Sequence, residues 1–206
     1  MSTVTFDHKT MVGLSSMGAA LASKDSTLPL LGKVLLEGRH AFATDRYAAG
    51  DMLLPEKMEV PGRWLVPAAT LKALAASKWD VCFDSEAGTF TACNGGAVFP
   101  AEDDSPTEKT VNGVTYRDGN QFPPVERLIV DKPGDGRVET WGMTPEMLAR
   151  FAKLRSPLTG KAFGSFTMHT PGETDGRTGA MLFESGEQLD GVSVVRVAAM
   201  PCHYNK

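Results

Sequence analysis

The sequence predicts an α+β fold in which one strand, one helix and about three strands recur along the chain. Apolar residues recur at three- and four-residue steps in three stretches that begin near positions 9, 67 and 145, which is typical of helices. Short apolar runs bounded by turn-forming residues follow each stretch and are typical of strands. The sequence shows no fixed short period, so the repetition lies in the order of the elements.

The first unit begins with a strand candidate at 4–7. A helix is predicted over 9–24 from its apolar period, and either Asp7 or Thr10 is suited to cap its start. Three strands are predicted after this helix, over 33–37, 40–43 and 50–54.

The second unit is predicted to begin with a strand over 63–66. Pro67 fits the first position of a second helix, where its missing N–H costs nothing, and that helix is expected to end near Lys78. Three strands are predicted to follow, over 79–84, 89–94 and 97–100. Residues 101–120 are polar and rich in turn formers, which predicts an exposed excursion with a hairpin at Asn112-Gly113.

A plausible linker at 132–136 divides the chain into two predicted domains, 1–130 and 137–206. In the second domain, Thr144 is suited to cap a helix, Pro145 fits its first position and Glu146 places an acid in its first turn. The last strands are predicted over 163–169, 180–184 and 192–198.

The charge of the chain limits its partners. Its 21 Lys and Arg residues stand against 25 Asp and Glu residues, a net charge of −4. A protein with this balance does not bind nucleic acid over its whole surface, although a basic stripe on an acidic body remains compatible with it. The sequence has neither the ~20 apolar residues of a membrane helix nor a signal-peptide pattern, so we expect a cytoplasmic protein.

The sequence favours a binding protein over an enzyme. The four histidines are scattered, and the glycine motifs of phosphate-binding loops and of serine hydrolases are missing. Cys202 and His203 are neighbours on a predicted strand and so point to opposite faces. Cys82 and Cys93 either face each other across a hairpin or are two small buried residues, and the second interpretation is favoured. We therefore predict no catalytic residues, no metal site and no cofactor.

Three segments, in this order, resemble segments of the bacterial sliding clamp family, the β subunit of DNA polymerase III. They are FATDRYAAG (42–50), QFPPVERLI (121–129) and VSVVRVAAMPCHY (192–204). The resemblance implies the DNA clamp fold, with sheets outside and helices on one inner face. It implies that 1–130 is a complete clamp domain of two units, that 137–206 is a half domain of one unit, and that the rest of a full clamp is absent.

The resemblance also implies a role in DNA replication as a processivity factor, because a clamp encircles duplex DNA. Residues that line such a ring contact phosphates without reading sequence. The predicted helices carry seven candidates for this DNA-facing role, namely Lys9, Lys24, Lys72, Lys78, Arg150, Lys153 and Arg155. For any one of these residues, a plain solvated helix face is the simpler interpretation. The bias toward basic residues in all three helices favours DNA.

The family captures peptide tails of polymerases and repair proteins in an apolar pocket. Carried over by motif, the pocket residues are Thr44, Arg46, Tyr47, Pro123, Arg127, Leu128, Met200 and Pro201. The sequence departs from the family pattern at positions 46–49 and 202–203, so we expect a shallower pocket that binds a different peptide set. Without the resemblance, a hairpin turn and a strand end would explain the same residues.

A full ring of this family uses about twelve strand-helix units, and this chain offers three, so we expect a homo-oligomer, hypothetically a tetramer with closed symmetry. The expected partners are double-stranded DNA, a DNA polymerase and other proteins with clamp-binding motifs, and a clamp loader. A short clamp of this kind suits a compact genome such as that of a phage. The alternative is a non-encircling adaptor or decoy that keeps only the peptide pocket.

Overall fold

The computed structural model describes residues 3–105, 107–111, 114–118, 121–127, 129, 143–169, 173–174, 177–178 and 180–200. In this part of the chain the α-helices are α1 (His8–Leu21), α2 (Ala68–Ala76) and α3 (Pro145–Phe151), and the 3-10 helices are η1 (Pro29–Gly32), η2 (Glu56–Met58) and η3 (Val125–Arg127). The strands are β1 (Thr3–Phe6), β2 (Lys33–Gly38), β3 (His40–Thr44), β4 (Ala48–Leu53), β5 (Val60–Pro67), β6 (Val81–Asp84), β7 (Thr89–Ala92), β8 (Val98–Pro100), β9 (Glu102–Asp103), β10 (Thr107–Val111), β11 (Val114–Asp118), β12 (Phe166–His169), β13 (Glu173–Thr174), β14 (Arg177–Thr178), β15 (Met181–Ser185), β16 (Gln188–Leu189), β17 (Val192–Ser193) and β18 (Val195–Ala199).

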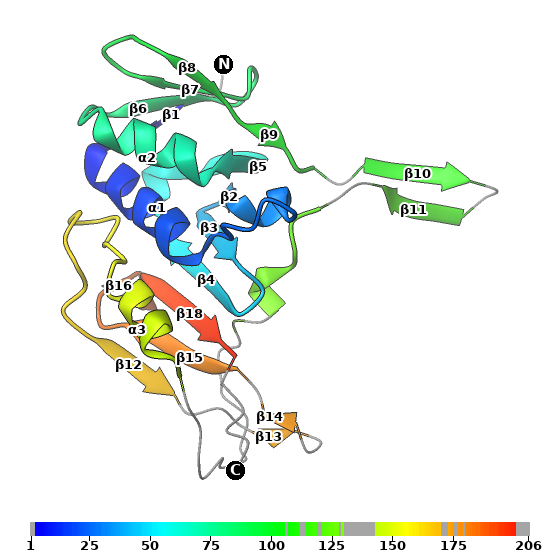
Figure 1. Ribbon diagram of the computed structural model, residues 1–206. Coiled ribbons are helices and arrows are strands. Elements are labelled where there is room, and N and C mark those ends of the chain that lie inside the picture. The colour runs from blue at the N-terminus through cyan, green and yellow to red at the C-terminus, as the bar shows by residue number, and fades with distance from the viewer. Residues whose placement is uncertain are drawn as a thin grey trace.

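Two units of identical topology exchange their first strands (Figure 1). The first unit is β1-α1-β2-β3-β4 and the second is β5-α2-β6-β7-β8. Strand β1 pairs with β6 of the second unit, and β5 pairs with β2 of the first. Strands β2-β3-β4 and β6-β7-β8 then continue the two sheets in the same order. A two-fold operation therefore exchanges the two units, and each completes the sheet of the other.

The third unit consists of α3, β12, β15 and β18, in the order of α1, β2, β3 and β4. Its last strand β18 pairs antiparallel with β4, the last strand of the first unit. This pairing joins the two units in one eight-stranded sheet with the order β12-β15-β18-β4-β3-β2-β5-β9. The predicted boundary between 130 and 137 falls outside the described residues, so the division into two domains stays a prediction.

The joint between the first and third units carries charged side chains on one face of the sheet. The buried carboxylate of Asp51 on β4 accepts a hydrogen bond from Arg196 Nη2 on β18, at 2.7 Å. Its other oxygen lies 2.8 Å from His40 Nδ1 on β3. Further along, Glu184 on β15 pairs with His169 on β12. These pairs connect neighbouring strands at and on both sides of the joint. They add charge-assisted hydrogen bonds to the backbone hydrogen bonds of the sheet.

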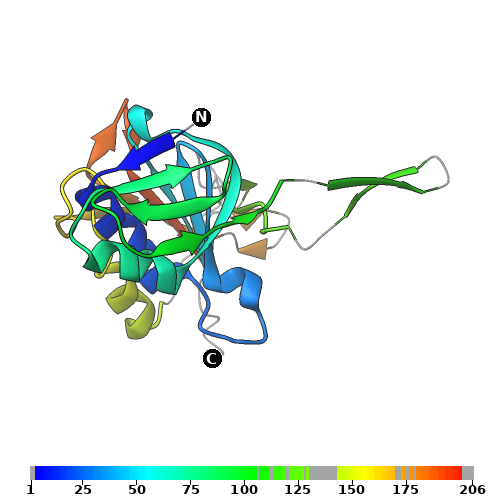
Figure 2. The ribbon, with the colours of Figure 1, turned by 90° about the horizontal axis from the view of Figure 1, so that it is seen from above.

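The main hydrophobic core lies between the helices and the sheets. Alternate residues of a strand face opposite sides, and on β4 Gly50 faces α1 so closely that an added Cβ would lie 2.2 Å from Leu21 Cδ1. Ala49 faces the other way, into a smaller core with Phe42, Phe122 and other residues. All three helices cover the same side of the eight-stranded sheet (Figures 1 and 2).

The helix starts confirm the predictions made from capping residues. The Asp7 side chain accepts a hydrogen bond from Thr10 N at 2.9 Å, and Thr144 caps α3 with Pro145 in its first turn. Pro67, by contrast, is the N-cap residue of α2 and still belongs to β5. Helix α1 ends at Leu21, short of the predicted end, because the backbone of Ala22 is extended. The described part of the chain includes no helix that is both long and apolar enough to span a membrane.

Two features of the loops test the remaining predictions. Strands β10 and β11 form the hairpin expected around Asn112-Gly113, and this hairpin projects away from the sheets (Figures 1 and 2). The prediction that Cys82 and Cys93 are separate buried residues is wrong. They form a disulfide with Cα atoms 5.6 Å apart, since the β6–β7 pairing brings them together, and Cys93 is exposed.

Candidate functional site

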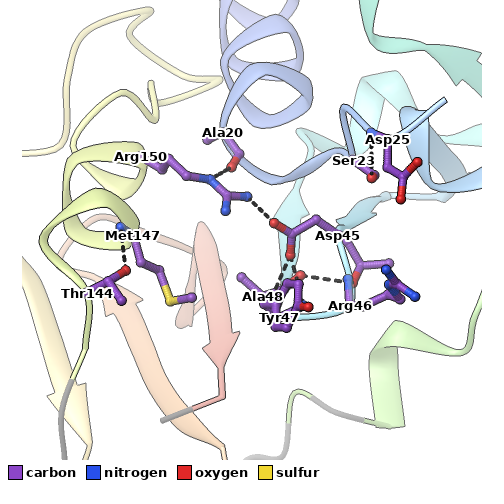
Figure 3. A network of polar contacts seen from close by, with 11 residues as sticks. Ala20, Ser23, Asp25, Asp45, Arg46, Tyr47, Ala48, Thr144, Met147 and Arg150 are labelled. Atoms are coloured by element: carbon purple, nitrogen blue, oxygen red, sulfur yellow. Dashed lines mark hydrogen bonds and ion pairs between the residues drawn. The ribbon is translucent and has the colours of Figure 1, made fainter. Parts of the chain in front are cut away.

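The first candidate segment is a turn over residues 44–48, between β3 and β4. Thr44 Oγ1 donates to the carbonyl of Ala48 at 2.9 Å and accepts from the N–H of Arg46 at 3.2 Å. The Asp45 carboxylate accepts from the N–H groups of Tyr47 and Ala48 at 3.0 and 2.8 Å (Figure 3). These bonds hold Arg46 in the left-handed region, at φ 81°, and leave the Tyr47 side chain 63% exposed.

Asp45 also connects this turn to two helices. Its second oxygen lies 2.6 Å from Arg150 Nη2 on α3, and Arg150 Nε donates to the carbonyl of Ala20 in α1 at 2.7 Å (Figure 3). Asp45 was missed in the sequence, although an aspartate that accepts from its own backbone two residues later is a recognisable turn signal. The turn therefore has a fixed position relative to α1 and α3.

The structure brings parts of the three family-like segments to one end of the sheet. The N–H of Met200 donates to the carbonyl of Tyr47 at 2.9 Å, and both side chains are at least half exposed. Phe122, Val125 and Ile129 of the middle segment pack in the smaller core beside β3, β4 and β18. In that segment Pro123 is half-buried and Arg127 is exposed. Leu128 and Pro201 lie outside the described residues.

Asp104 fixes the start of the middle segment. Its buried carboxylate accepts a hydrogen bond from the N–H of Phe122, 3.3 Å from each oxygen, and pairs with Arg63 Nη2 at 3.1 Å. Burial of Arg63 opposes its charge, but hydrogen bonds to Glu37 and Asp104 outweigh this effect and raise the pKa of its guanidinium. The middle segment is thus attached to β5 through an ion pair.

A cavity of about 350 Å³ lies on the helix side of the 44–48 turn. Its wall includes three basic residues, Lys24, Arg46 and Arg150, and three acidic residues, Asp25, Asp45 and Glu146. The hydroxyl and then the amide of Thr27 lower the pKa of the Asp25 carboxyl, with a smaller contribution from Arg46. Tyr47 also lines this cavity, but most of the other polar residues of the wall are charged, so an apolar peptide anchor fits better on the Met200 side of Tyr47 than inside the cavity.

Five of the seven predicted DNA-facing residues have exposed side chains: Lys9, Lys24, Lys72, Lys78 and Lys153. They lie on, or directly after, the three helices that cover one side of the sheet (Figures 1 and 2). The other two are half-buried. Arg150 is held by Asp45 and Ala20, and Arg155 Nη1 donates to the carbonyls of Ala152 and Leu154. Their guanidinium groups already have partners within the chain.

Comparison with known proteins finds similarity to solved structures alone. The chain matches no protein-family model and no curated protein. Solved β subunits of DNA polymerase III match it over nearly its whole length. The structure from Borrelia burgdorferi has a TM-score of 0.62 at 9% identity, with 100% of this chain and 65% of that chain covered. The DnaN sliding clamp from Bartonella birtlesii has 0.61 at 11%, covering 98% and 66%. The subunit from Pseudomonas aeruginosa has 0.60 at 13%, covering 98% and 67%. The chain thus spans about two-thirds of the length of these proteins, and it has the fold of the DNA polymerase III β sliding clamps.

Proposed function

We propose that this chain is a clamp-like processivity factor, which encircles duplex DNA as a homo-oligomer and tethers a polymerase through a peptide-binding site. One observation carries the proposal: the described parts of three segments that resemble the walls of the family's peptide pocket come together around β3, β4 and β18. Tyr47 and Met200 are exposed there on a backbone fixed by hydrogen bonds. A rigid backbone with exposed apolar anchors suits an extended peptide tail.

Peptide binding is tested with a fluorescent peptide that carries the apolar clamp-binding tail of a replicative polymerase. Tyr47→Ala and Met200→Ala should each raise its Kd by about tenfold, which corresponds to ~1.4 kcal/mol of lost contact. Val98→Ala, at an exposed valine on β8 outside the three segments, is the matched control and should leave the Kd unchanged. Equal binding by all four proteins would refute this site.

DNA contact is supported by the exposed lysines of the helix side. Lys72→Glu combined with Lys78→Glu should reduce the slope of log K against log salt by about two, since each lost phosphate contact removes ~0.9. Lys57→Glu, on η2 and outside the three helices, reverses a single charge and serves as the control for Lys72→Glu alone. Encirclement further predicts that closed circular DNA retains the protein while linear DNA with free ends loses it. Equal retention on both forms would contradict a ring.

The adaptor that does not encircle DNA is a second candidate, and one observation favours it. Arg150 is paired with the Asp45 carboxylate and Arg155 Nη1 donates to backbone carbonyls, so both guanidinium groups are less available to a duplex than the sequence suggested. An adaptor would bind the polymerase peptide with normal affinity and show neither salt-dependent DNA binding nor retention on circles. The two experiments together therefore separate the candidates, and in both of them the chain acts by binding rather than by catalysis.

A further inference from the structure

In the described part of the chain, one face of the third unit lacks a neighbour. The corresponding faces of the first two units are covered, because these two units pack against each other. In the first unit, α2 packs against α1, and β5 pairs with the outer edge of β2. Gly18 of α1 illustrates how closely they fit, because an added Cβ would lie 3.0 Å from Ala68 Cβ of α2. In the third unit, α3 and β12 take the places of α1 and β2. Among the described residues, β12 is the edge of its sheet.

An apolar cavity of about 460 Å³ occupies this uncovered face. It lies between α3 and the strands, and its wall includes Leu148, Phe151, Phe163, Phe166, Met168 and Phe183. Leu148 and Met168 line the same cavity and are 49% and 43% exposed, which is unusual for two large apolar residues of one patch. Within the described part of the chain, the outer edge of β12 has no neighbouring strand and offers its backbone groups to a partner. The face therefore combines the two surfaces that a neighbouring unit would cover.

We infer that the α3–β12 face binds the same face of a second copy of this chain, so that two third units cover each other across a two-fold axis, as the first and second units do. The topology supports this occupant over an unrelated protein. The first and second units cover each other reciprocally, and the face used is the same on both. A surface that binds the same surface of a second copy forms a closed two-fold contact. The inference gives the proposed homo-oligomer a specific contact, and it requires neither DNA nor peptide binding.

The first test is sedimentation velocity of the full chain from about 1 to 200 µM, a range in which a self-association of micromolar Kd is visible. Wild type should associate. Leu148→Glu on α3 and Met168→Glu on β12 should each weaken association at least tenfold, because both place a charge in an apolar contact. Val192→Glu is the matched control, since Val192 is also exposed but lies on β17, and it should associate like wild type.

The second test is hydrogen exchange, which locates the contact. The amides of β12 should exchange more slowly as the wild-type concentration rises, and this change should vanish in Leu148→Glu. A monomeric wild type at the highest concentration would overturn the inference. So would protection of β12 that does not depend on concentration, or concentration-dependent protection of β8 in place of β12.

Failure of this inference and failure of the proposed function are distinguishable. Leu148→Glu should bind the fluorescent peptide as wild type does, because Leu148 lies outside the 44–48 turn. If wild type is monomeric but binds the peptide, the inference is refuted and the adaptor function stands. If wild type associates through β12 but binds no peptide, the inference stands and the proposed site is refuted.

Discussion

Gly13→Ala is the substitution that most directly tests the packing between α1 and the third unit. Gly13 lies in the middle of α1, where alanine would normally stabilise the helix by ~1 kcal/mol. An added Cβ, however, would lie 2.9 Å from Pro157 Cα, 3.0 Å from Pro157 N and 3.1 Å from Pro157 Cβ. All three distances are shorter than ordinary van der Waals contact.

The Pro157 backbone cannot easily move away. Thr10 Oγ1 donates to the Pro157 carbonyl at 2.9 Å, and the N–H of Arg155 donates to Ser16 Oγ at 2.8 Å. Overpacking costs about 1–3 kcal/mol, and these bonds favour the upper part of that range. Alanine recovers ~1 kcal/mol of this cost through its higher helix propensity, so we expect the free energy of unfolding to fall by about 1–2 kcal/mol.

The loss is measured by thermal and urea unfolding. For a chain of this size it corresponds to a Tm lower by about 3–6 °C. Gly32→Ala is the matched control, because the one contact it would make is with the Ser23 carbonyl at 3.5 Å, and it should leave the Tm within about 1 °C of wild type. A Gly13→Ala protein that is as stable as wild type, or more stable, would refute the tight contact with the third unit.

Three further predictions concern the polar contacts and the disulfide. Asp51→Ala removes the buried carboxylate that accepts from Arg196 and faces His40. It should lower the free energy of unfolding by about 3 kcal/mol in urea titrations, whereas a loss below about 1 kcal/mol would contradict a buried pair. Asp45→Asn keeps the turn's acceptor oxygen but removes the charge opposite Arg150. We expect the free energy of unfolding to fall by about 1 kcal/mol in the same assay, and an unchanged value would show that the pair is dispensable. Cys82→Ser should cost the oxidised protein about 2 kcal/mol and the reduced protein nothing, and equal stability of oxidised wild type and variant would rule out the bond.

The local features of the fold were predictable because their causes lie within a few residues. Asp7 and Thr144 each precede a helix and satisfy its first free N–H groups, which is visible in the sequence. Pro67 is compatible both with a strand end and with the first turn of a helix, since its fixed φ suits either, so its position was predicted only approximately. The alternation of a strand also does not identify its partner, and for this reason the exchange of β1 and β5 could not be predicted.

The candidate site was predictable to a lesser degree. The resemblance pointed to Tyr47 and Met200, and the structure joins them by a backbone hydrogen bond. Sequence reasoning assigned Arg150 to DNA because it recognised a basic helix, but it could not see that Asp45, far away in the chain, pairs with this side chain. The sequence allows Cys82 and Cys93 to face each other across a hairpin, but it favours two small buried residues because cysteine is often buried. Cys93 is instead exposed, and the two residues form a disulfide.

The pairing of β4 with β18 bears on the sidedness of any closed assembly. Each is the final strand of its unit, and the two run antiparallel in one sheet. The two-fold axis that relates them is therefore perpendicular to that sheet, and a rotation about it leaves the helices of both units on the same side. In a closed band of such sheets this axis is radial, and a radial axis exchanges the top of the band with its bottom. If the contacts between copies are also of this kind, the band has no top or bottom of its own. Each 44–48 turn would then recur on both rims, and a polymerase could approach from either direction along the duplex.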